Sequence, residues 1–343
     1  MAKILVGISG GLDSTFAVDR LLREGHEVGT LLLDMHGNAE VEDAKKIAET
    51  YGVPFDVLDT KERFDACVVD YFVEEYSRGR TPNPCVRCNR TVKIASLCEY
   101  AKAHGYELVA TGHYANKYYD ETSGRYSISF AKDMKKDQSY VLWELSQEQI
   151  EMLVFPLGDM AKSEVREYAA SKRLEVADRP ESQEICFIPD DDYVSFIEVR
   201  KGVFPRGPFL DLEGKVIGEH KGIIHYTVGQ RKGLGMSFGE HMFVKSIDAA
   251  TNSITLCRKG EEYSDRLWVD ELNFVGLTPI EEGELELDVK LRYAALPVPA
   301  TIRVGKGRAE VILHAPARAI TPGQSAVFYR DGRIMLGGII QKE

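Results

Sequence analysis

The sequence of 343 residues has no run of 18 or more apolar residues, which is the length that a membrane-spanning helix requires. It also lacks a signal-peptide pattern, because Met-Ala-Lys leads directly into a strand-like run. Cysteine is scarce, and six unevenly spaced cysteines in a chain of this length suit a reducing compartment better than a disulfide framework. We therefore expect a cytoplasmic protein that has no membrane partner.

Basic residues are also fewer than acidic ones. Lys and Arg number 43 against 54 Asp and Glu, which gives a formal net charge of −11. Such an acidic chain does not bind nucleic acid over its whole surface, so any RNA contact has to use a local basic patch. Two stretches contain basic but no acidic residues: residues 77–94, with Arg78, Arg80, Arg87, Arg90 and Lys93, and residues 289–309, with Lys290, Arg292, Arg303, Lys306 and Arg308. The second stretch fits either a solvated face of a β-barrel or a surface for phosphate contact.

The glycine-rich stretch near the start lacks the lysine of the Walker P-loop, and its spacing differs from that of the G-x-G-x-x-G fingerprint. The string GISGGLDST fills residues 7–15, between the apolar residues 4–6 and a helix-like segment at residues 16–23. A strand, a glycine turn and a helix N-terminus together direct backbone N–H groups and a positive dipole end at one small volume. This arrangement predicts an anion site, with an ordinary turn at a helix start as the alternative.

The side chains of this stretch indicate which anion it binds. Gly10 and Gly11 allow the backbone to approach phosphate oxygens, and Ser9 and Ser14 add hydroxyl donors. Asp13 would repel phosphates unless a cation bridges them. The stretch therefore predicts a nucleotide phosphate site that uses Mg²⁺.

Strand-like and helix-like segments alternate over the first 200 residues. This alternation predicts a doubly wound parallel α/β sheet, whose ligands lie at the carboxyl ends of its strands. Leu33 ends the second strand at that edge, where it either contacts adenine or belongs to the core. Gly112 and His113 follow a later strand at the same edge. The strands are expected at residues 4–6, 27–33, 55–58 and 107–110, and the helices at residues 16–23, 39–51, 65–78, 91–104 and 162–172.

Beyond about residue 200 the helical pattern gives way to short alternating strands. A glycine-rich, basic segment at residues 220–235 and a turn and strand at residues 249–258 indicate a small β-rich module. Strands expected at residues 285–291, 309–313 and 326–329 suggest a C-terminal β-barrel. We predict three domains, which span residues 1–200, 201–262 and 263–343.

Two cysteines lie in the first basic stretch. Cys85 and Cys88 belong to the string RTPNPCVRCNR, in which the prolines and asparagines exclude regular structure, so the next helix is expected to begin near Thr91. Positive surroundings and a nearby helix start favour the thiolate form, which makes both cysteines candidates for reactive thiols. The C-x-x-C spacing also suits zinc, but the chain has no second C-x-x-C and no H-x₃₋₅-H pair. Three further cysteines have contexts that predict buried side chains: Cys67, Cys98 and Cys257.

Seven motifs, taken in order, give a resemblance to a known family. They are SGGLDS at residues 9–14, TPNP at 81–84 with CN at 88–89, TGHY at 111–114, KDQSY at 136–140, SQEICF at 182–187, GQRKGL at 229–234 and TPGQSA at 321–326. The set resembles the bacterial tRNA-specific 2-thiouridylase family over essentially the whole chain. The first motif is similar to the pyrophosphate-binding loop (PP-loop) of the ATP pyrophosphatases. The resemblance implies an N-terminal domain of the adenine nucleotide alpha hydrolase-like fold, a central β-rich domain that binds tRNA and a C-terminal barrel.

The resemblance implies an ATP-dependent sulfurtransferase that converts the wobble uridine, at position 34 of the tRNA anticodon, to 2-thiouridine. ATP adenylates the O2 of the uridine and releases pyrophosphate, and sulfur from a protein cysteine persulfide then displaces AMP. A ring carbonyl has no leaving group, so the activation is chemically necessary. The implied cofactors are ATP and Mg²⁺. The implied partners are the anticodon stem-loop of tRNA and a cysteine desulfurase or sulfur-relay protein that donates sulfur.

The resemblance also implies a role for individual residues. Cys186 carries the persulfide, Cys88 is the nucleophile that forms a disulfide with it, and Asp13 is the catalytic carboxylate of the loop. The residues implied to bind ATP are Gly7, Ile8, Ser9, Gly10, Gly11, Leu12, Asp13, Ser14, Leu33 and Gly112. The residues implied to border the target base are Asn83, Pro84 and Cys85. The residues implied to contact tRNA are His113, Lys136, Asp137, Gln138, Arg292, Tyr293 and Gln324.

One position departs from the family pattern, since many members have Asp where this chain has Cys85. Either a thiol takes over part of the role of that carboxylate, or Cys85, Cys88 and Cys186 together hold an iron–sulfur (4Fe–4S) cluster, and both routes stay open. The rival function is an ATP-dependent amide synthetase related to NAD or GMP synthetase, which needs no cysteine pair, basic loop or barrel. A catalytically inactive tRNA-binding paralogue is disfavoured because the loop, Asp13 and the key cysteines are all present.

Overall fold

The computed structural model describes residues 1–37, 39–172, 185–236 and 239–342. Its N-terminal part contains a sheet of five parallel strands in the order β3-β2-β1-β4-β7. The strands are β1 (Lys3–Ile8), β2 (Glu27–Asp34), β3 (Phe55–Asp59), β4 (Leu108–Ala110) and β7 (Leu153–Val154). The predicted parallel α/β sheet is confirmed, and the two-residue strand β7 is an addition that the sequence pattern did not reveal.

Four helices cover the two faces of this sheet: α1 (Leu12–Arg23), α2 (Val41–Tyr51), α6 (Ile94–Ala103) and α8 (Lys162–Ser171). Successive side chains of a strand point to opposite faces, so a doubly covered strand is apolar throughout. Ile4, Val6 and Ile8 of β1 pack in one core with α1, α2 and α8. Leu5 packs in a second core, with α6.

Two long helical runs contain a π-helical turn each. The first is α3 (Lys61–Phe64), η1 (Asp65–Val69) and α4 (Asp70–Ser77), and the second is α5 (Pro84–Cys88), η2 (Asn89–Lys93) and α6. The second run begins at Pro84, so the prediction of irregular structure up to residue 90 is wrong. Asn83 caps the run by accepting a hydrogen bond from Cys85 N at 3.2 Å, and Pro84 stands at the first helical position, where proline costs no hydrogen bond.

The central part follows η5 (Pro189–Asp191) and α9 (Tyr193–Lys201), and it is a four-stranded sheet in the order β10-β11-β8-β9. Its elements are β8 (Gly207–Leu210), β9 (Val216–His220), η6 (Ile223–His225), β10 (Met242–Asp248) and β11 (Ser253–Arg258). The strand expected within residues 249–258 is β11. The glycine-rich segment that follows β9 forms turns and the short helix η6.

The C-terminal part is an antiparallel six-stranded barrel, as the sequence predicts. Its strands are β12 (Tyr263–Phe274), β13 (Gly283–Lys290), β14 (Val298–Gly305), β15 (Arg308–Arg318), β16 (Ser325–Arg330) and β17 (Arg333–Gln341). Their order is β12-β15-β14-β13-β16-β17, and pairing of β12 with β17 closes the barrel. Closure removes the exposed sheet edges that would otherwise invite aggregation.

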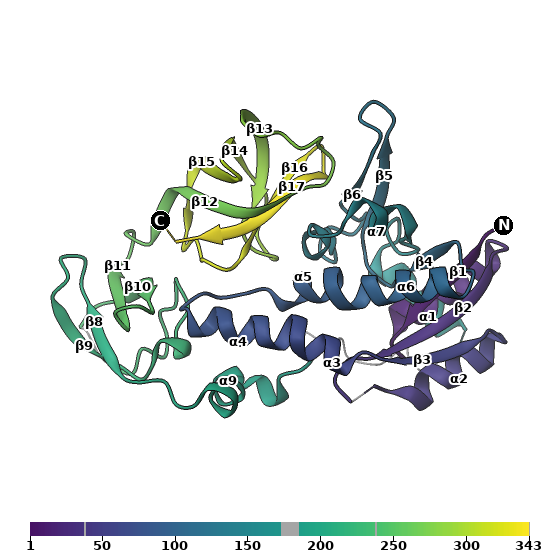
Figure 1. Ribbon diagram of the computed structural model, residues 1–343, viewed down its shortest axis with the longest axis horizontal. Helices are drawn as coiled ribbons and strands as arrows, with labels where there is room; N and C mark the ends of the chain where they lie inside the picture. The colour runs from purple at the N-terminus through teal and green to yellow at the C-terminus, as the bar shows by residue number, and fades with distance from the viewer. Residues whose placement is uncertain (38, 173–184, 237–238, 343) are drawn as a thin grey trace.

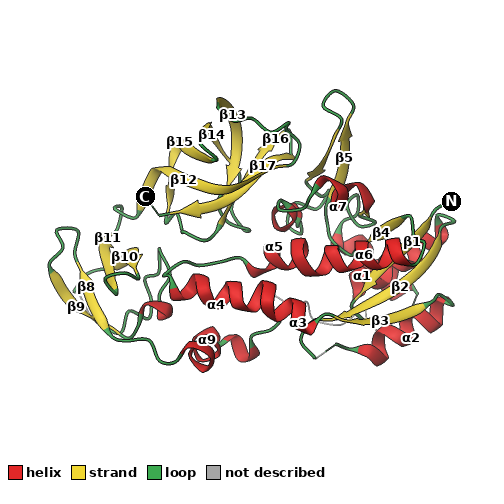
Figure 2. Cartoon of the chain, viewed as in Figure 1, coloured by secondary structure: helices red, strands yellow, loops and turns green. Residues whose placement is uncertain are grey.

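Figure 1 shows the parallel sheet at one end of the molecule and the central sheet at the other, with the barrel above the helices that connect them. Helix α4 and the α5–α6 run extend along this connection (Figure 2). Four further elements link the parallel sheet to the barrel: β5 (Asn116–Asp120), β6 (Arg125–Ser129), η3 (Ser139–Leu142) and α7 (Gln147–Met152). The β5–β6 hairpin joins the barrel sheet beside β17.

The aromatic segment at η3 attaches the barrel to the N-terminal part. Tyr140 and Trp143 are fully buried, and both bond to Ser325 of β16. The Tyr140 hydroxyl donates to the Ser325 carbonyl oxygen at 2.9 Å, and Trp143 Nε1 donates to Ser325 Oγ at 2.9 Å. Barrel residues such as Val327 and Tyr329 share one core with Leu5 of the parallel sheet. Within the described residues no helix has the length and apolar character of a membrane span.

We expect Ser325→Ala to lower the free energy of unfolding by about 1–3 kcal/mol, because it leaves the buried Trp143 N–H without an acceptor. The midpoint of urea unfolding measures the effect. Ser171→Ala, at the exposed end of α8, serves as the control and should shift the midpoint little. Equal midpoints for the two variants would contradict the assigned hydrogen bond.

Candidate active site

The loop between β1 and α1 has the geometry of an anion site. Gly10 has a φ of 74°, a conformation that favours glycine, and Gly11 is the extended N-cap residue of α1. No side chain of the described residues caps this helix N-terminus. Ser14 Oγ instead donates to the Gly11 carbonyl oxygen at 3.0 Å and accepts from Ser9 N at 3.2 Å, which fixes the turn. The first-turn N–H groups of α1 therefore remain available to a ligand.

Gly112 lies against this loop, as its predicted place at the same sheet edge requires. A Cβ on Gly112 would stand 3.0 Å from Asp13 Cβ and 3.0 Å from Ser14 N. Strand β4, which precedes Gly112, pairs directly with β1, which precedes the loop. The absence of a side chain at Gly112 is therefore what lets the two loops meet.

Asp13 has two partners that the sequence did not reveal. Lys162 Nζ, at the start of α8, lies 2.7 Å and 2.8 Å from the two carboxylate oxygens of Asp13. The hydroxyl of Tyr114 donates to Asp13 Oδ1 at 2.9 Å. Tyr114 belongs to a motif already singled out, but nothing in the local sequence connects Lys162 with a loop 149 residues away.

The three predicted site cysteines are neighbours. Cys85 and Cys88 lie in the first turn of the α5–α6 run, where Cys88 is buried and Cys85 exposed; Cys186 is also exposed. Cys85 and Cys186 are close enough to Cys88 to raise the pKa of its thiol. Cys88 Sγ is 3.9 Å from the sulfur of Met35, the residue directly after β2. The thiols therefore lie at the carboxyl edge of the parallel sheet, next to the strand that leads into the loop.

The expectation that positive surroundings favour thiolates at this site is wrong. Burial raises the pKa of the Cys88 thiol to about 11. Cys85 and Cys186 keep exposed surface, but the protein around their sulfur atoms desolvates these thiols and raises their pKa values as well. Lys93 opposes this effect at all three thiols but does not overcome it. Of the cysteines predicted to be buried, Cys98 and Cys257 are buried, whereas Cys67 is half-buried.

The positive charge of the first basic stretch is largely neutralised by carboxylates from elsewhere in the chain. Arg80 Nε lies 2.7 Å from Glu75, and Arg78 Nη2 lies 3.0 Å from Glu74. Arg87 contacts both Glu144 at 2.7 Å and Glu271 at 3.1 Å. Glu74 and Glu75 lie just before the stretch, whereas Glu144 and Glu271 come from distant parts of the chain, so the composition of the stretch alone overstated the positive field at the thiols.

Several residues predicted to contact tRNA have their side chains engaged inside the protein. His113 is buried beside Thr111, with 2.9 Å between Nδ1 and Oγ1, and burial lowers the pKa of His113 to about 3, so its imidazole is neutral. Gln138 Oε1 accepts from Tyr114 N at 2.9 Å. Asp137 is buried and accepts from Ser139 Oγ at 2.8 Å, with Lys290 Nζ at 3.9 Å. Lys136 is half-buried.

Of the barrel residues predicted to contact tRNA, two bond to other parts of the protein and one has an exposed side chain. Gln324 Nε2 donates to the carbonyl oxygens of Thr81 and Pro82, at 2.8 Å and 3.3 Å. Arg292 donates to Thr321 Oγ1 at 3.1 Å, whereas the ring of Tyr293 is 43% exposed. The second basic stretch is also partly neutralised: Arg303 pairs with Glu284, Arg308 pairs with Asp270, and Lys290 is buried.

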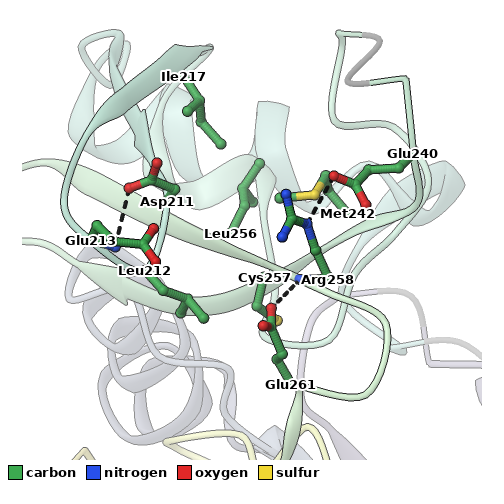
Figure 3. Close-up of a pocket in the computed structure, with 10 residues that line it drawn as sticks. All are labelled: Asp211, Leu212, Glu213, Ile217, Glu240, Met242, Leu256, Cys257, Arg258 and Glu261. Atoms are coloured by element: carbon green, nitrogen blue, oxygen red, sulfur yellow. Dashed lines mark hydrogen bonds and ion pairs between the residues drawn. The ribbon is translucent and has the colours of Figure 1, made fainter.

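A separate cavity of about 290 Å³ lies in the central part (Figure 3). Four carboxylates line it, from Asp211, Glu213, Glu240 and Glu261, against one guanidinium, that of Arg258. Arg258 Nε itself pairs with Glu240 at 2.9 Å. This negative cavity is unsuited to RNA phosphates, and it is not lined by any residue of the phosphate loop.

Leu33 is buried in the core next to α6. The remaining parts of the predicted site are Asn83 and Pro84, which start the α5–α6 run beside Cys85. Residues 182–184 of the SQEICF motif lie outside the described residues. In the part of the chain that the structure describes, no three His, Cys, Asp or Glu side chains are arranged to hold a metal ion.

Comparison with known proteins places this site in a family. Three domain families match in succession: "tRNA methyl transferase HUP domain" over residues 2–190, "tRNA methyl transferase PRC-barrel domain" over residues 195–258 and "Aminomethyltransferase beta-barrel domain" over residues 264–340. Proteins named tRNA-specific 2-thiouridylase MnmA match the whole chain. The one from Carboxydothermus hydrogenoformans is 42% identical over 99% of this chain and 98% of its own. The one from Clostridioides difficile is 41% identical over the same shares.

The chain belongs to the tRNA-specific 2-thiouridylase family. Membership confirms the resemblance drawn from the seven motifs, and with it the predicted class of a sulfurtransferase that uses ATP. The domain families also agree with the fold observed here, in which a HUP-type sheet, a central β-rich part and a barrel follow one another. In this fold the loop of residues 9–14 and the predicted site cysteine Cys88 lie at the same edge of the parallel sheet.

We expect Cys88 to react slowly with iodoacetamide at pH 8. A thiol whose pKa is raised from 9.0 to about 11 is about 100-fold less ionised at that pH, and only the thiolate reacts. Peptide mass spectrometry of the native protein gives the rate, with N-acetylcysteine as the reference thiol. The rate should still rise above pH 9, and a plateau below pH 8 would contradict the raised pKa.

We expect Gly112→Ala to weaken the binding of AMPCPP, an ATP analogue that cannot be cleaved between its α- and β-phosphates. The new methyl group would press on Asp13 and Ser14, and overpacking of about 1–3 kcal/mol corresponds to a loss of about 5- to 100-fold in affinity. Isothermal titration calorimetry measures the change. Gly305→Ala is the matched control, because a Cβ at Gly305 meets no atom of the described residues within 4 Å.

Proposed function

We propose that this chain converts the wobble uridine of tRNA to 2-thiouridine by adenylation of O2 and sulfur transfer from a cysteine persulfide. The observation that supports this proposal most is the shared position of the thiols and the phosphate loop. Cys88 lies against Met35, directly after β2, and the loop begins at Ser9, directly after the neighbouring strand β1. An amide synthetase would need the loop but not the thiols.

Adenylation takes place at the loop. The O2 of uridine attacks the α-phosphorus of ATP, the bond from that phosphorus to the bridging oxygen breaks, and pyrophosphate leaves with the electron pair. The N-terminus of α1 supplies backbone N–H donors to the phosphates. The Ser9 and Ser14 hydroxyls bond to each other and Ser14 donates to the Gly11 carbonyl oxygen, so they hold the turn in the shape that presents these N–H groups. We assign the loop from Gly7 to Ser14 and the adjacent Gly112 to ATP, with Leu33 at the adenine.

The residues at the loop fit Mg²⁺. The ion is usually held by one or two carboxylates together with substrate phosphates, and Asp13 supplies a carboxylate at the helix N-terminus. Bound there, Mg²⁺ would neutralise phosphate charge. A 4Fe–4S cluster held by three cysteines would place each thiolate on a different iron atom, and Cys85, Cys88 and Cys186 are the residues that would hold it. The proposed mechanism places no step on a cluster, and an iron assay distinguishes the two routes.

Sulfur transfer uses two thiols. The terminal sulfur of a persulfide on Cys186 attacks C2 of the adenylated uridine, and AMP leaves with the former O2. Cys88 then attacks Sγ of Cys186, so that the transferred sulfur stays on C2 and a Cys88–Cys186 disulfide forms. Two thiol sulfurs are oxidised while the transferred sulfur is reduced. A cellular thiol reduces the disulfide, and a cysteine desulfurase or sulfur-relay protein reloads Cys186.

For the tRNA we propose contacts at the start of α5 and on the barrel. An anticodon loop presents its bases unpaired, so the wobble base reaches the site at little cost. Asn83, Pro84 and Cys85 border the base. Lys136 and Tyr293 contact the RNA directly.

The other residues assigned to tRNA position the binding surface and do not contact the RNA themselves. Their side chains bond to neighbouring parts of the protein and thereby shape the surface that the anticodon meets. They are His113, Asp137, Gln138, Arg292 and Gln324.

Cys88→Ser and Cys186→Ser should each abolish 2-thiouridine formation and leave AMPCPP affinity unchanged within about twofold, since neither change alters the phosphate loop. The assay incubates anaerobically purified protein with tRNA, ATP, Mg²⁺ and a sulfur source, and detects the nucleoside by mass spectrometry. Cys257→Ala is the control, because Cys257 lies on β11 of the central sheet and is not among the predicted site residues, and it should retain activity.

Iron and sulfide are assayed on the same preparation. Product formed without bound iron supports the persulfide route, whereas activity only with about four irons per chain would replace it with the cluster route. Absence of 2-thiouridine with the wild-type protein under both conditions would favour the amide synthetase instead.

A further inference from the structure

The phosphate loop lies in a negative environment. Asp13 belongs to it, and a Cβ at Gly10 would stand 3.4 Å from a carboxylate oxygen of Glu40 and 3.5 Å from Cβ of Asp43. The loop itself contains no basic residue. A triphosphate carries about four negative charges at neutral pH, so such a site requires cations from elsewhere in the fold.

Lys162 brings a cation to this loop. Its ammonium group lies 2.7 Å and 2.8 Å from the Asp13 oxygens, and its side chain is only 7% exposed. The same ammonium group lies over the ring of Tyr114, 5.5 Å from its centroid, and the Tyr114 hydroxyl bonds to the same carboxylate. The charge of Lys162 is therefore confined to the N-terminus of α1, where the phosphates are proposed to bind.

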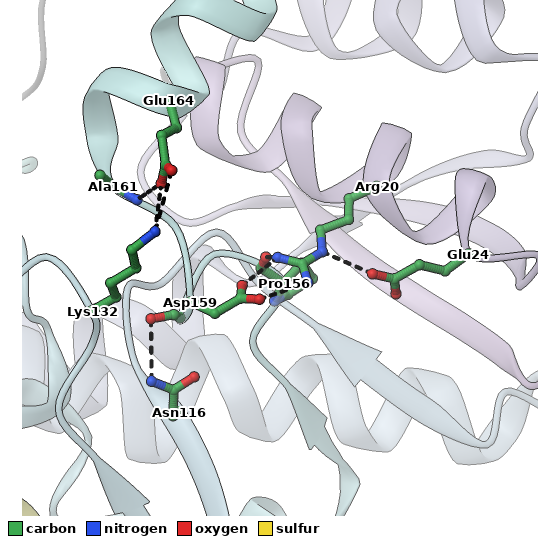
Figure 4. Close-up of polar contacts among 9 residues, drawn as sticks. Arg20, Glu24, Asn116, Lys132, Pro156, Asp159, Ala161 and Glu164 are labelled. Carbon is green, nitrogen blue, oxygen red and sulfur yellow. Dashed lines mark hydrogen bonds and ion pairs between the residues drawn. The ribbon is translucent and has the colours of Figure 1, made fainter.

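The segment before Lys162 is fixed to the helix that carries Asp13 (Figure 4). Arg20 of α1 donates to the Pro156 carbonyl oxygen at 2.6 Å and forms a two-pronged ion pair with Asp159. Glu164 closes the first turn of α8 by accepting from Ala161 N at 2.6 Å. These contacts set the position of Lys162 relative to the loop before any ligand is present.

Neither stability nor helix electrostatics explains a lysine at this position. Lys162 is the first residue of α8, and the N-terminal end of a helix disfavours positive charge. A nearly buried ion pair also adds little stability compared with apolar side chains of similar volume. A position that violates local preference in this way is characteristic of a functional residue.

We propose that Lys162 binds the β- and γ-phosphates of ATP. The assignment rests on the proposed function, since it requires ATP at the loop. Lys162 takes the place that the loop lysine has in Walker proteins, but it reaches the phosphates from another helix. On ATP binding its ammonium group exchanges Asp13 for phosphate oxygens, which frees the Asp13 carboxylate. During adenylation it stabilises the negative charge that passes to the departing pyrophosphate.

Calorimetric titration with AMPCPP and with AMP tests the assignment without tRNA or turnover. Lys162→Met should lose about tenfold or more in affinity for AMPCPP and keep its affinity for AMP, because AMP lacks the phosphates that Lys162 contacts. Lys162→Arg should recover part of the loss. Lys172→Met removes the same charge from the exposed end of α8 and should bind both nucleotides as the wild type does.

A second pair of variants keeps the assignment testable if Lys162→Met leaves the Asp13 carboxylate unpaired and the variant protein misfolds. Asp13→Asn and the double variant Asp13→Asn/Lys162→Met differ only in the lysine, and neither retains the Asp13 charge. A further loss of about tenfold in AMPCPP affinity for the double variant supports phosphate binding. No further loss, or equal losses for AMP and AMPCPP, would show that Lys162 serves only to neutralise Asp13. Failure of the wild type to bind AMPCPP would overturn the ATP site itself, and this assignment with it.

Discussion

The parallel sheet imposes the constraint on which the rest of the site depends. All five strands run in one direction, so every loop that follows a strand emerges at the same edge. The glycine turn after β1, Met35 after β2 and Gly112 after β4 therefore lie at that edge, although they are far apart in sequence, and Gly112 packs against the turn. The helix that starts directly after the turn directs its N–H groups to that edge. A phosphate site and a thiol site thus become neighbours without any dedicated scaffold.

At the Cys88 thiol, burial raises the pKa and nearby positive charge lowers it, and the effect of burial is the larger. The cations that local composition places around Cys85 and Cys88 are largely paired with Glu74, Glu75 and Glu144. Burial therefore favours the protonated form of the Cys88 thiol, which is less reactive than the thiolate.

The sequence predicted elements and motifs well because these depend on local patterns. The alternation of strands and helices, the barrel and the loop at residues 9–14 all follow from periodicity and turn chemistry. The start of α5 was missed because proline and asparagine were interpreted as breakers, although Asn83 as N-cap and Pro84 after it begin a helix. Lys162 and the Glu144 partner of Arg87 could not be found, because only tertiary contacts bring them to the site. The pairing of Arg78 with Glu74 is a local i,i+4 contact that the sequence could have indicated, whereas the burial that raises the Cys88 pKa depends on tertiary packing.

The barrel contacts the segment that leads into α5 through hydrogen bonds. Gln324 donates to the backbone of Thr81 and Pro82, Thr81 N donates to the Pro322 carbonyl oxygen at 2.9 Å, and Arg80 donates to Gln341 at 2.7 Å. A Cβ at Gly323 would come within 2.9 Å of Thr81 N, so the backbone at Gly323 lies directly against the backbone at Thr81. These contacts hold the segment that leads into Asn83 and the first turn of α5. The barrel therefore helps to position the segment that carries Cys85 and Cys88, and it does so through backbone contacts rather than through its charges.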